Sequence, residues 1–104
     1  MFQMIVLYDK PADAAAFDAH YDTVHTPLAE RIPGVRRLTV ARPGPADDGT
    51  AAAWHVVATL EFDDQAAFEA GMGSPEGQAA VADLPRFAGA GVTVLTAPDV
   101  RQIL

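Results

Sequence analysis

The sequence of 104 residues has no cysteine and no asparagine, and it has only one serine and one lysine. Without cysteine, disulfide frameworks, thiolate metal sites and cysteine nucleophiles are excluded. Without asparagine, there is no N-glycosylation sequon. Ser74 precedes Pro75 at the expected start of a helix, so we interpret the serine as a helix cap rather than as a catalytic nucleophile.

Positive charge is also scarce, since the net charge is −7. A nucleic-acid-binding protein normally carries a basic face that neutralises phosphates, so we expect no nucleic-acid partner. No apolar run is long enough to span a bilayer, and the opening MFQMIVLYDKP has no basic leader. These absences favour a soluble cytoplasmic protein with no membrane partner.

Half of the residues are apolar, which is sufficient for the core of a single domain over residues 1–104. Short β-rich runs and helical spacings alternate along the chain. Strands are predicted at residues 2–8, 35–42, 54–62 and 91–98, and helices at 14 to about 34, 63–72 and 74–88. The order β-α-β-β-α-β predicts an α+β, ferredoxin-like protomer with an antiparallel four-stranded sheet.

Two helical regions can cover only one face of such a sheet. The first strand nevertheless carries apolar residues on both faces, with Ile5 and Leu7 on one side and Met4, Val6 and Tyr8 on the other. An exposed apolar sheet face indicates an interaction surface. We therefore expect a homodimer in which two sheets pack face to face.

The stretch FDAHYDTVHTPLAERIPGV, residues 17–35, contains two of the three histidines. Phe17, Tyr21, Val24 and Leu28 recur at helical spacing and form the expected core stripe. In a regular helix the i, i+5 spacing places His20 and His25 about 140° apart, so no two-histidine metal site is predicted.

Pro27 is expected to bend or break this helix near Val24 or His25. His20 is expected at the boundary of the core, with one nitrogen in water. His25 either satisfies backbone carbonyls freed by the proline or points into a pocket as a general acid or base. Asp22 is the expected orienting group for its ring.

Several aromatic residues are candidates for lining that pocket. Tyr21 on the core stripe and Tyr8 at the end of the first strand each need a partner for the hydroxyl, in the core or on a ligand. Trp54 belongs to the apolar row of its strand and is expected to face the helices. His55 is then expected to face away from them. Asp83 is interpreted as a solvated or capping residue, and no organic cofactor motif is visible.

The pattern VLYDKPADAAAFDAHYDTVHTPLAERIPGVRRL, followed by Phe62-Asp63 and SPEGQAAVADLPRFAGAGVTVL, resembles the EthD family over nearly the whole chain. The most specific parts are F-x-x-H-Y-x-x-x-H-x-P-L at 17–28 and the segment at 74–88. The resemblance implies a dimeric α+β barrel with a pocket in each protomer between sheet and helices. His25 matches the histidine of H-x-P-L, and His20 and Tyr21 match the preceding H-Y pair.

Three functions remain open at this point. The first is a cofactor-independent isomerase or cyclase that acts on an apolar carbonyl or aromatic metabolite, with His25 as general acid or base and Tyr8, His20, Tyr21 and Trp54 as binding residues. The second is a non-catalytic accessory protein of an oxidative degradation or biosynthesis system. The third is a haem-binding protein that uses His25 or His55.

Overall fold

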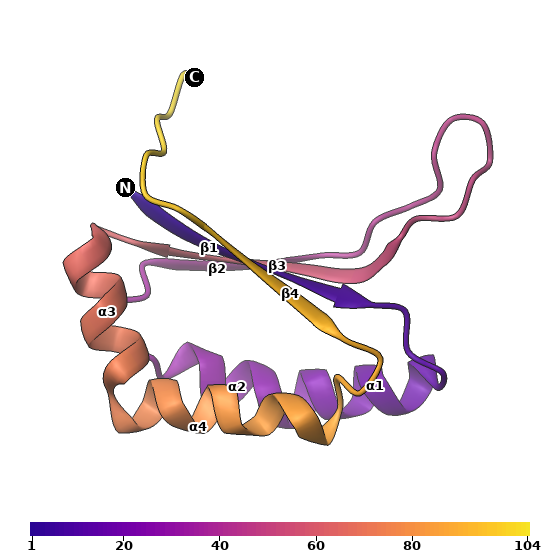
Figure 1. Cartoon of the computed structure of the whole chain (residues 1–104), viewed down its shortest axis with the longest axis horizontal. Helices are drawn as coiled ribbons and strands as arrows, with labels where there is room; N and C mark the ends of the chain where they lie inside the picture. The colour runs from indigo at the N-terminus through magenta and orange to yellow at the C-terminus, as the bar shows by residue number, and fades with distance from the viewer.

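The protein is a four-stranded antiparallel sheet with its helices gathered on one face (Figure 1). A computed structural model describes all 104 residues. The strands are β1 (Phe2–Asp9), β2 (Arg37–Ala41), β3 (Trp54–Phe62) and β4 (Val92–Ala97), in the sheet order β2-β3-β1-β4. This arrangement confirms the predicted α+β, ferredoxin-like fold.

The helical segments begin at the residues that the capping chemistry indicates. They are α1 (Ala14–His20), η1 (Tyr21–His25), α2 (Thr26–Glu30), α3 (Gln65–Gly73), α4 (Pro75–Asp83) and the 3₁₀ turn η2 (Leu84–Arg86). Asp13, Asp64 and Ser74 each accept a hydrogen bond from a backbone N–H three residues later. None of these helices combines the length and the apolar character that crossing a membrane would require.

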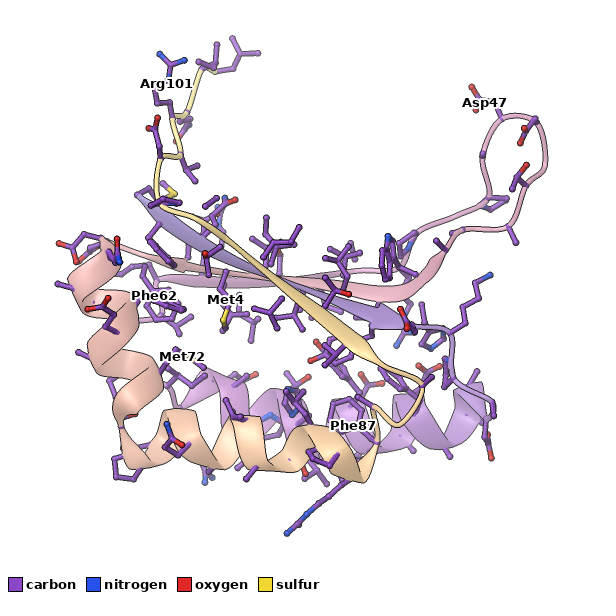
Figure 2. All side chains as sticks on the ribbon, viewed as in Figure 1. Met4, Asp47, Phe62, Met72, Phe87 and Arg101 are labelled. Atoms are coloured by element: carbon purple, nitrogen blue, oxygen red, sulfur yellow. The ribbon has the colours of Figure 1, made fainter.

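The core lies between the sheet and the helices (Figure 2). On β1 every second side chain is buried, and the same holds for β3 from Val56 onward. The register pairs Tyr8 with Val56 and Met4 with Leu60, so the two buried rows share the helix-facing side. The labelled Met4, Phe62, Met72 and Phe87 all point into this layer, whereas Asp47 and Arg101 lie on segments that extend away from it.

The opposite face of the sheet carries no helix (Figure 1). Ile5 and Leu7 on β1 are half-buried on this face, and Leu95, which pairs with Ile5, is 49% exposed. The long loop between β2 and β3 and the C-terminal tail both extend beyond the sheet on this side. The apolar face predicted from the sequence is therefore present and open in the single chain.

Candidate active site

The site is built on a widened turn in the helix that follows β1. Segments α1, η1 and α2 run on as one helix, and η1 is a π turn in which the N–H of Thr26 bonds to the carbonyl of Tyr21. Pro27 has no N–H, and in a regular α-helix its ring would collide with the carbonyl four residues earlier. A π turn is a known way to absorb such a residue, and π turns are frequent at functional sites. Of the two outcomes expected from Pro27, a bend or a break, the break does not occur, because the helix continues through a widened turn at Tyr21–His25.

The extra residue in this turn moves the core stripe by one position. Val24, which was expected to face the core, is 39% exposed, whereas His25 is buried at 7%. The 140° separation calculated for a regular helix no longer applies, because a turn closed over five residues brings i and i+5 toward one side. His20 and His25 consequently reach the same group.

That group is the carboxylate of Asp83, the last residue of α4. His20 Nε2 lies 2.9 Å from Oδ1 and 3.0 Å from Oδ2, and His25 Nδ1 lies 3.0 Å from Oδ2. Asp83 is only 1% exposed, so its interpretation as a solvated or capping residue is wrong. Asp22 is exposed, and the group that orients the His25 ring is Asp83 on another helix.

The electrostatics keep the carboxylate ionised. Burial alone would raise the pKa of Asp83, but the hydrogen bonds from His20 and His25 outweigh burial and hold that pKa below its ordinary value. Burial lowers the pKa of His25, and this effect outweighs the hydrogen bond and the charge of Asp83, which would raise that pKa. At neutral pH the pair is therefore a carboxylate and a neutral imidazole.

These contacts fix which nitrogen of His25 carries the proton. A carboxylate only accepts hydrogen bonds, so Nδ1 donates to Asp83 and Nε2 is left with a lone pair. Nε2 lies 3.3 Å from the hydroxyl oxygen of Tyr8. Burial raises the pKa of Tyr8, which keeps this hydroxyl protonated as the donor. The geometry is that of a histidine base oriented by a buried carboxylate.

His25 faces an apolar cavity between the sheet and the helices. Its volume including the open mouth is about 560 Å³, of which about 80 Å³ can be reached by the centre of a water-sized sphere. Fourteen of the sixteen lining residues are hydrophobic, and His25 and Thr26 are the other two. Val94 of the edge strand β4 and Val81 of α4 both line the cavity and are about half exposed, which places the mouth between these two elements.

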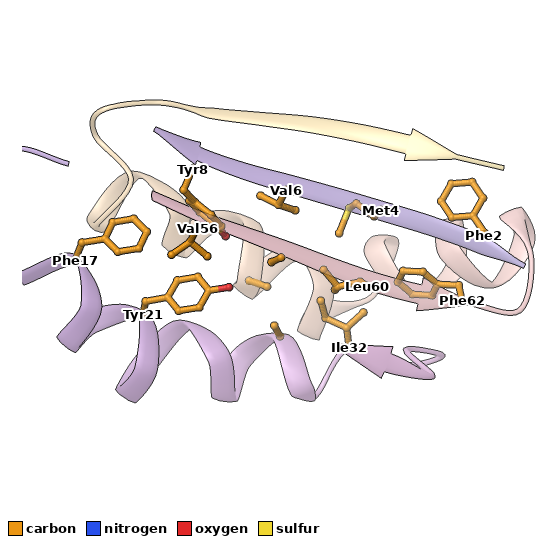
Figure 3. Packing of buried hydrophobic residues seen from close by; sticks show 13 residues of the cluster. Phe2, Met4, Val6, Tyr8, Phe17, Tyr21, Ile32, Val56, Leu60 and Phe62 are labelled. Atoms are coloured by element: carbon orange, nitrogen blue, oxygen red, sulfur yellow. The ribbon is translucent and has the colours of Figure 1, made fainter. Parts of the chain in front are cut away.

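Two tyrosines bring hydroxyl groups to this cavity (Figure 3). Tyr8 on β1 and Tyr21 on η1 have their ring centroids 5.4 Å apart in an edge-to-face arrangement. Burial raises the pKa of Tyr21 to about 12, so this hydroxyl is also a donor at neutral pH. His25 and the two tyrosines are thus brought together, as the sequence analysis proposed for a pocket.

Trp54 and His55 lie on the faces of the sheet opposite to those expected: His55 faces the helices, and Trp54 faces away from them. The register shifts between Tyr8 and Asp9, and Asp9 pairs with Trp54, so a bulge at His55 turns Trp54 to the open face of the sheet. Trp54 does not line the cavity. His55 instead packs edge-on against Phe17, at 4.9 Å, and its Nε2 lies 2.9 Å from Oδ1 of Asp18. Trp54 is therefore not a pocket residue.

The residues present do not fit a haem. His55 Nε2 is bonded to Asp18, and the two nitrogens of His25 are bonded to Asp83 and Tyr8. In both imidazoles Nε2 already has a hydrogen-bond partner, so neither presents it to a haem iron. No group of three or more His, Asp or Glu side chains has the arrangement of a metal site.

Phe87 is the second residue that the sequence reasoning missed. Its ring stacks on His20 with a centroid separation of 5.0 Å, and it lies 4.8 Å from the His25 ring and 5.7 Å from that of Tyr8. Phe87 therefore packs against both imidazole rings and restrains their positions. One signal was present, because Asp83 and Phe87 both belong to SPEGQAAVADLPRFA, the segment that carries the resemblance at 74–88.

Comparison with known proteins places this site in a family. A family model described as the EthD domain matches residues 9–91. The chain belongs to the EthD family. An uncharacterised 11.0 kDa protein from the thcB-thcC intergenic region of Rhodococcus erythropolis is 41% identical over 97 residues, which are 91% of each chain. The crystal structure of an EthD family protein from Bacillus halodurans is 32% identical, covers 96% of this chain and 99% of its own, and has a TM-score of 0.89.

More distant solved structures share the fold. A dimeric ferredoxin-like protein of unknown function from Thermobifida fusca is 19% identical, with a TM-score of 0.68 over 93% of this chain and 89% of its own. SnoaB, a cofactor-independent oxygenase from Streptomyces nogalater, is 17% identical, with a TM-score of 0.67 over 98% of this chain and 95% of its own. At these identities the likeness concerns the fold.

Proposed function

We propose that this EthD protein is a cofactor-independent catalyst of proton transfer on a compact, apolar carbonyl or aromatic metabolite. The observation that carries the proposal is the unprotonated Nε2 of His25, which meets the Tyr8 hydroxyl at the wall of an apolar cavity while Asp83 holds the opposite nitrogen. A base in an apolar pocket, backed by a carboxylate, is an arrangement suited to abstracting a proton from a weak carbon acid.

The reaction class is isomerisation or cyclisation. His25 Nε2 takes a proton from the carbon next to a carbonyl group, and the C–H electron pair moves to form an enolate. A hydroxyl of Tyr8 or Tyr21 donates to the enolate oxygen as its charge develops. Asp83 stabilises the imidazolium. In an isomerisation the imidazolium returns the proton to a different carbon of an enolate that is conjugated with a C=C bond. In a cyclisation the enolate carbon attacks a second carbonyl group, and the proton goes to the alkoxide that forms. No redox step and no external reactant is required.

The shape of the cavity supports the ligand class. The wall is almost entirely apolar, and its mouth between Val81 and Val94 carries no charge. Pockets for small ligands are mostly apolar with a few placed polar groups, which here are the His25 imidazole and two tyrosine hydroxyls. Met4 and Met72 in the wall are flexible and adapt the volume to the ligand. SnoaB, described as a cofactor-independent oxygenase, is consistent with chemistry without a cofactor on this fold.

Hydrogen–deuterium exchange of ketone α-protons tests the proposal without knowledge of the natural substrate. The protein is incubated in D₂O with 2-tetralone, 1-indanone or cyclohexanone, and loss of the α-proton signal is followed by NMR. We expect the wild type to accelerate exchange of at least one ketone and the variant His25→Gln to lose this acceleration. His55→Gln, which alters a histidine bonded to another aspartate, is the matched control.

A different result would assign another role. If the ketones bind, seen as shifts of the Met4 and Met72 methyl signals, but exchange at the buffer rate, the catalytic proposal is wrong. The non-catalytic accessory role, in which the protein binds and carries an apolar ligand, is then the better description.

We also propose that the open sheet face is covered by a second copy of the chain. Its apolar residues include Ile5, Leu7 and the exposed Leu95, and burial of such a face is favourable. The protein from Thermobifida fusca with this fold is described as dimeric. Light scattering coupled to size exclusion is expected to give twice the mass of 11.0 kDa.

A further inference from the structure

The buried carboxylate of Asp83 separates two differently exposed imidazoles. His25 lies on the cavity side and is buried, whereas the side chain of His20 is 25% exposed. His20 also lines a second, open groove of about 520 Å³ formed with the loops around Pro11 and Gly89. A ligand in the cavity covers His25, but it leaves His20 in contact with solvent through the groove.

The contacts of His20 restrain the carboxylate in two ways. Its Nε2 lies within 3.0 Å of both oxygens of Asp83, so it holds the plane of the carboxylate, while Phe87 stacks on its ring. The same donor competes with His25 Nδ1 for the single negative charge of Asp83. A positive charge on His20 also acts against a second positive charge on His25.

Few other charges face His20. Arg86 of η2 and Asp13 before α1 line the same groove, Asp18 and Asp22 lie on the same helix as His20, and Asp83 is its hydrogen-bond partner. The Tyr8 and Tyr21 hydroxyls on the cavity side are neutral at physiological pH because burial raises the pKa of each. The charge on Asp83 is therefore divided mainly between the two histidines.

We propose that His20 is a positioning residue of this site, which orients the Asp83 carboxylate and, by sharing its charge, sets the basicity of His25. The N–H of His20 aligns the carboxylate, and it draws on the same negative charge that stabilises the imidazolium of His25. The role in turnover rests on the proposed function, but the coupling between the two imidazoles does not.

The test is the titration of His25 in the ligand-free protein, followed by the ¹⁵N signals of its imidazole. His20→Gln retains an N–H donor, and His20→Leu removes it. We expect the His25 midpoint to move to higher pH in His20→Leu, because Asp83 then interacts with His25 alone, and to move less in His20→Gln, which still donates to the carboxylate. Only His20→Gln is expected to keep the Nδ1–H tautomer fully populated. His55→Gln should leave the His25 signals unchanged.

The exchange assay separates coupling from catalysis. At pH 8 we expect His20→Gln to retain wild-type exchange and His20→Leu to lose about tenfold, the lower end of the loss known for orienting partners of metal-binding histidines. Unchanged His25 midpoints in both variants would overturn the inference even if exchange depends on His25. If the His25 midpoint shifts in the variants but the exchange of ketone protons does not depend on His25, the proposed function is overturned and the coupling between the two imidazoles stands.

Discussion

Replacement of Asp83 by asparagine should destabilise the protein, because it removes the charge shared by the buried His25 and the partly buried His20 while it conserves the shape. A hydrogen bond to a charged partner contributes about 1.5–3 kcal/mol and a neutral one about 0.5–1.5 kcal/mol. The difference is about 1 kcal/mol for each of the bonds from His20 and His25. The expected loss in the free energy of unfolding is therefore about 2 kcal/mol, or roughly 10 °C in the melting temperature.

The pH dependence of this loss has a defined sign. The pKa of Asp83 is lowered on folding, so its stabilisation is present above the unfolded value of about 3.9 and disappears as the pH falls through the folded value. The pKa of His25 is also lowered, so wild-type stability declines as the pH falls below about 6.5. Without Asp83 the pKa of His25 falls further. The difference between wild type and variant should thus widen from pH 7.5 to pH 5.5 and shrink below pH 4.

Urea denaturation followed by circular dichroism at these pH values measures the effect. Asp18→Asn is the matched control, because Asp18 also contacts a histidine, His55, but is 37% exposed. An exposed pair contributes less than about 1 kcal/mol. If Asp83→Asn and Asp18→Asn cost the same, or if the Asp83→Asn difference has no maximum in pH, the ionised buried carboxylate described above is wrong.

Three further variants test other parts of the molecule. Tyr8→Phe removes the donor to His25 Nε2 and should cost about 1 kcal/mol by urea denaturation, whereas an unchanged midpoint would show that this hydroxyl is not the donor. Gly77→Ala should cost about 1–3 kcal/mol, because a Cβ would collide with the carbonyl of Gly71, while Gly73→Ala, with open space around it, should be neutral or stabilising in the same assay. Leu95→Asp should convert the proposed dimer to monomer in light scattering, and a persistent dimer would place the interface elsewhere.

The fold was predictable because its signals are local. A short run that is apolar on both parities defines β1, alternating apolar residues define most of β3, and the caps Asp13, Asp64 and Ser74 mark where helices begin. Each signal lies within a few residues of the element that it specifies. The open apolar face followed from the apolar residues on both parities of β1.

The site was predictable only in part, because it depends on irregular backbone and on distant contacts. His25, Tyr8 and Tyr21 were proposed for a pocket and lie together. The π turn that rotates His25 inward adds one residue to a turn, which a fixed helical period cannot represent. Asp83 is 58 residues from His25, so its pairing requires the tertiary fold.

The bulge in β3 shows the same limit on a strand. Strict alternation from Phe62 back to Trp54 places the tryptophan with the core row. One extra residue opposite Tyr8 reverses the side for Trp54 and brings His55 to the helices. Nothing in the composition of the strand marks the position of that residue.

The central claim is that Asp83 holds His25 with an unprotonated Nε2 facing the cavity. The most direct test is the long-range ¹H–¹⁵N spectrum of the wild-type imidazoles at pH 7.5. We expect His25 to be neutral, with Nδ1 protonated and Nε2 at the shift of an unprotonated, pyridine-type nitrogen that accepts a hydrogen bond from Tyr8. A His25 signal with the proton on Nε2, or a doubly protonated ring at this pH, would contradict the account.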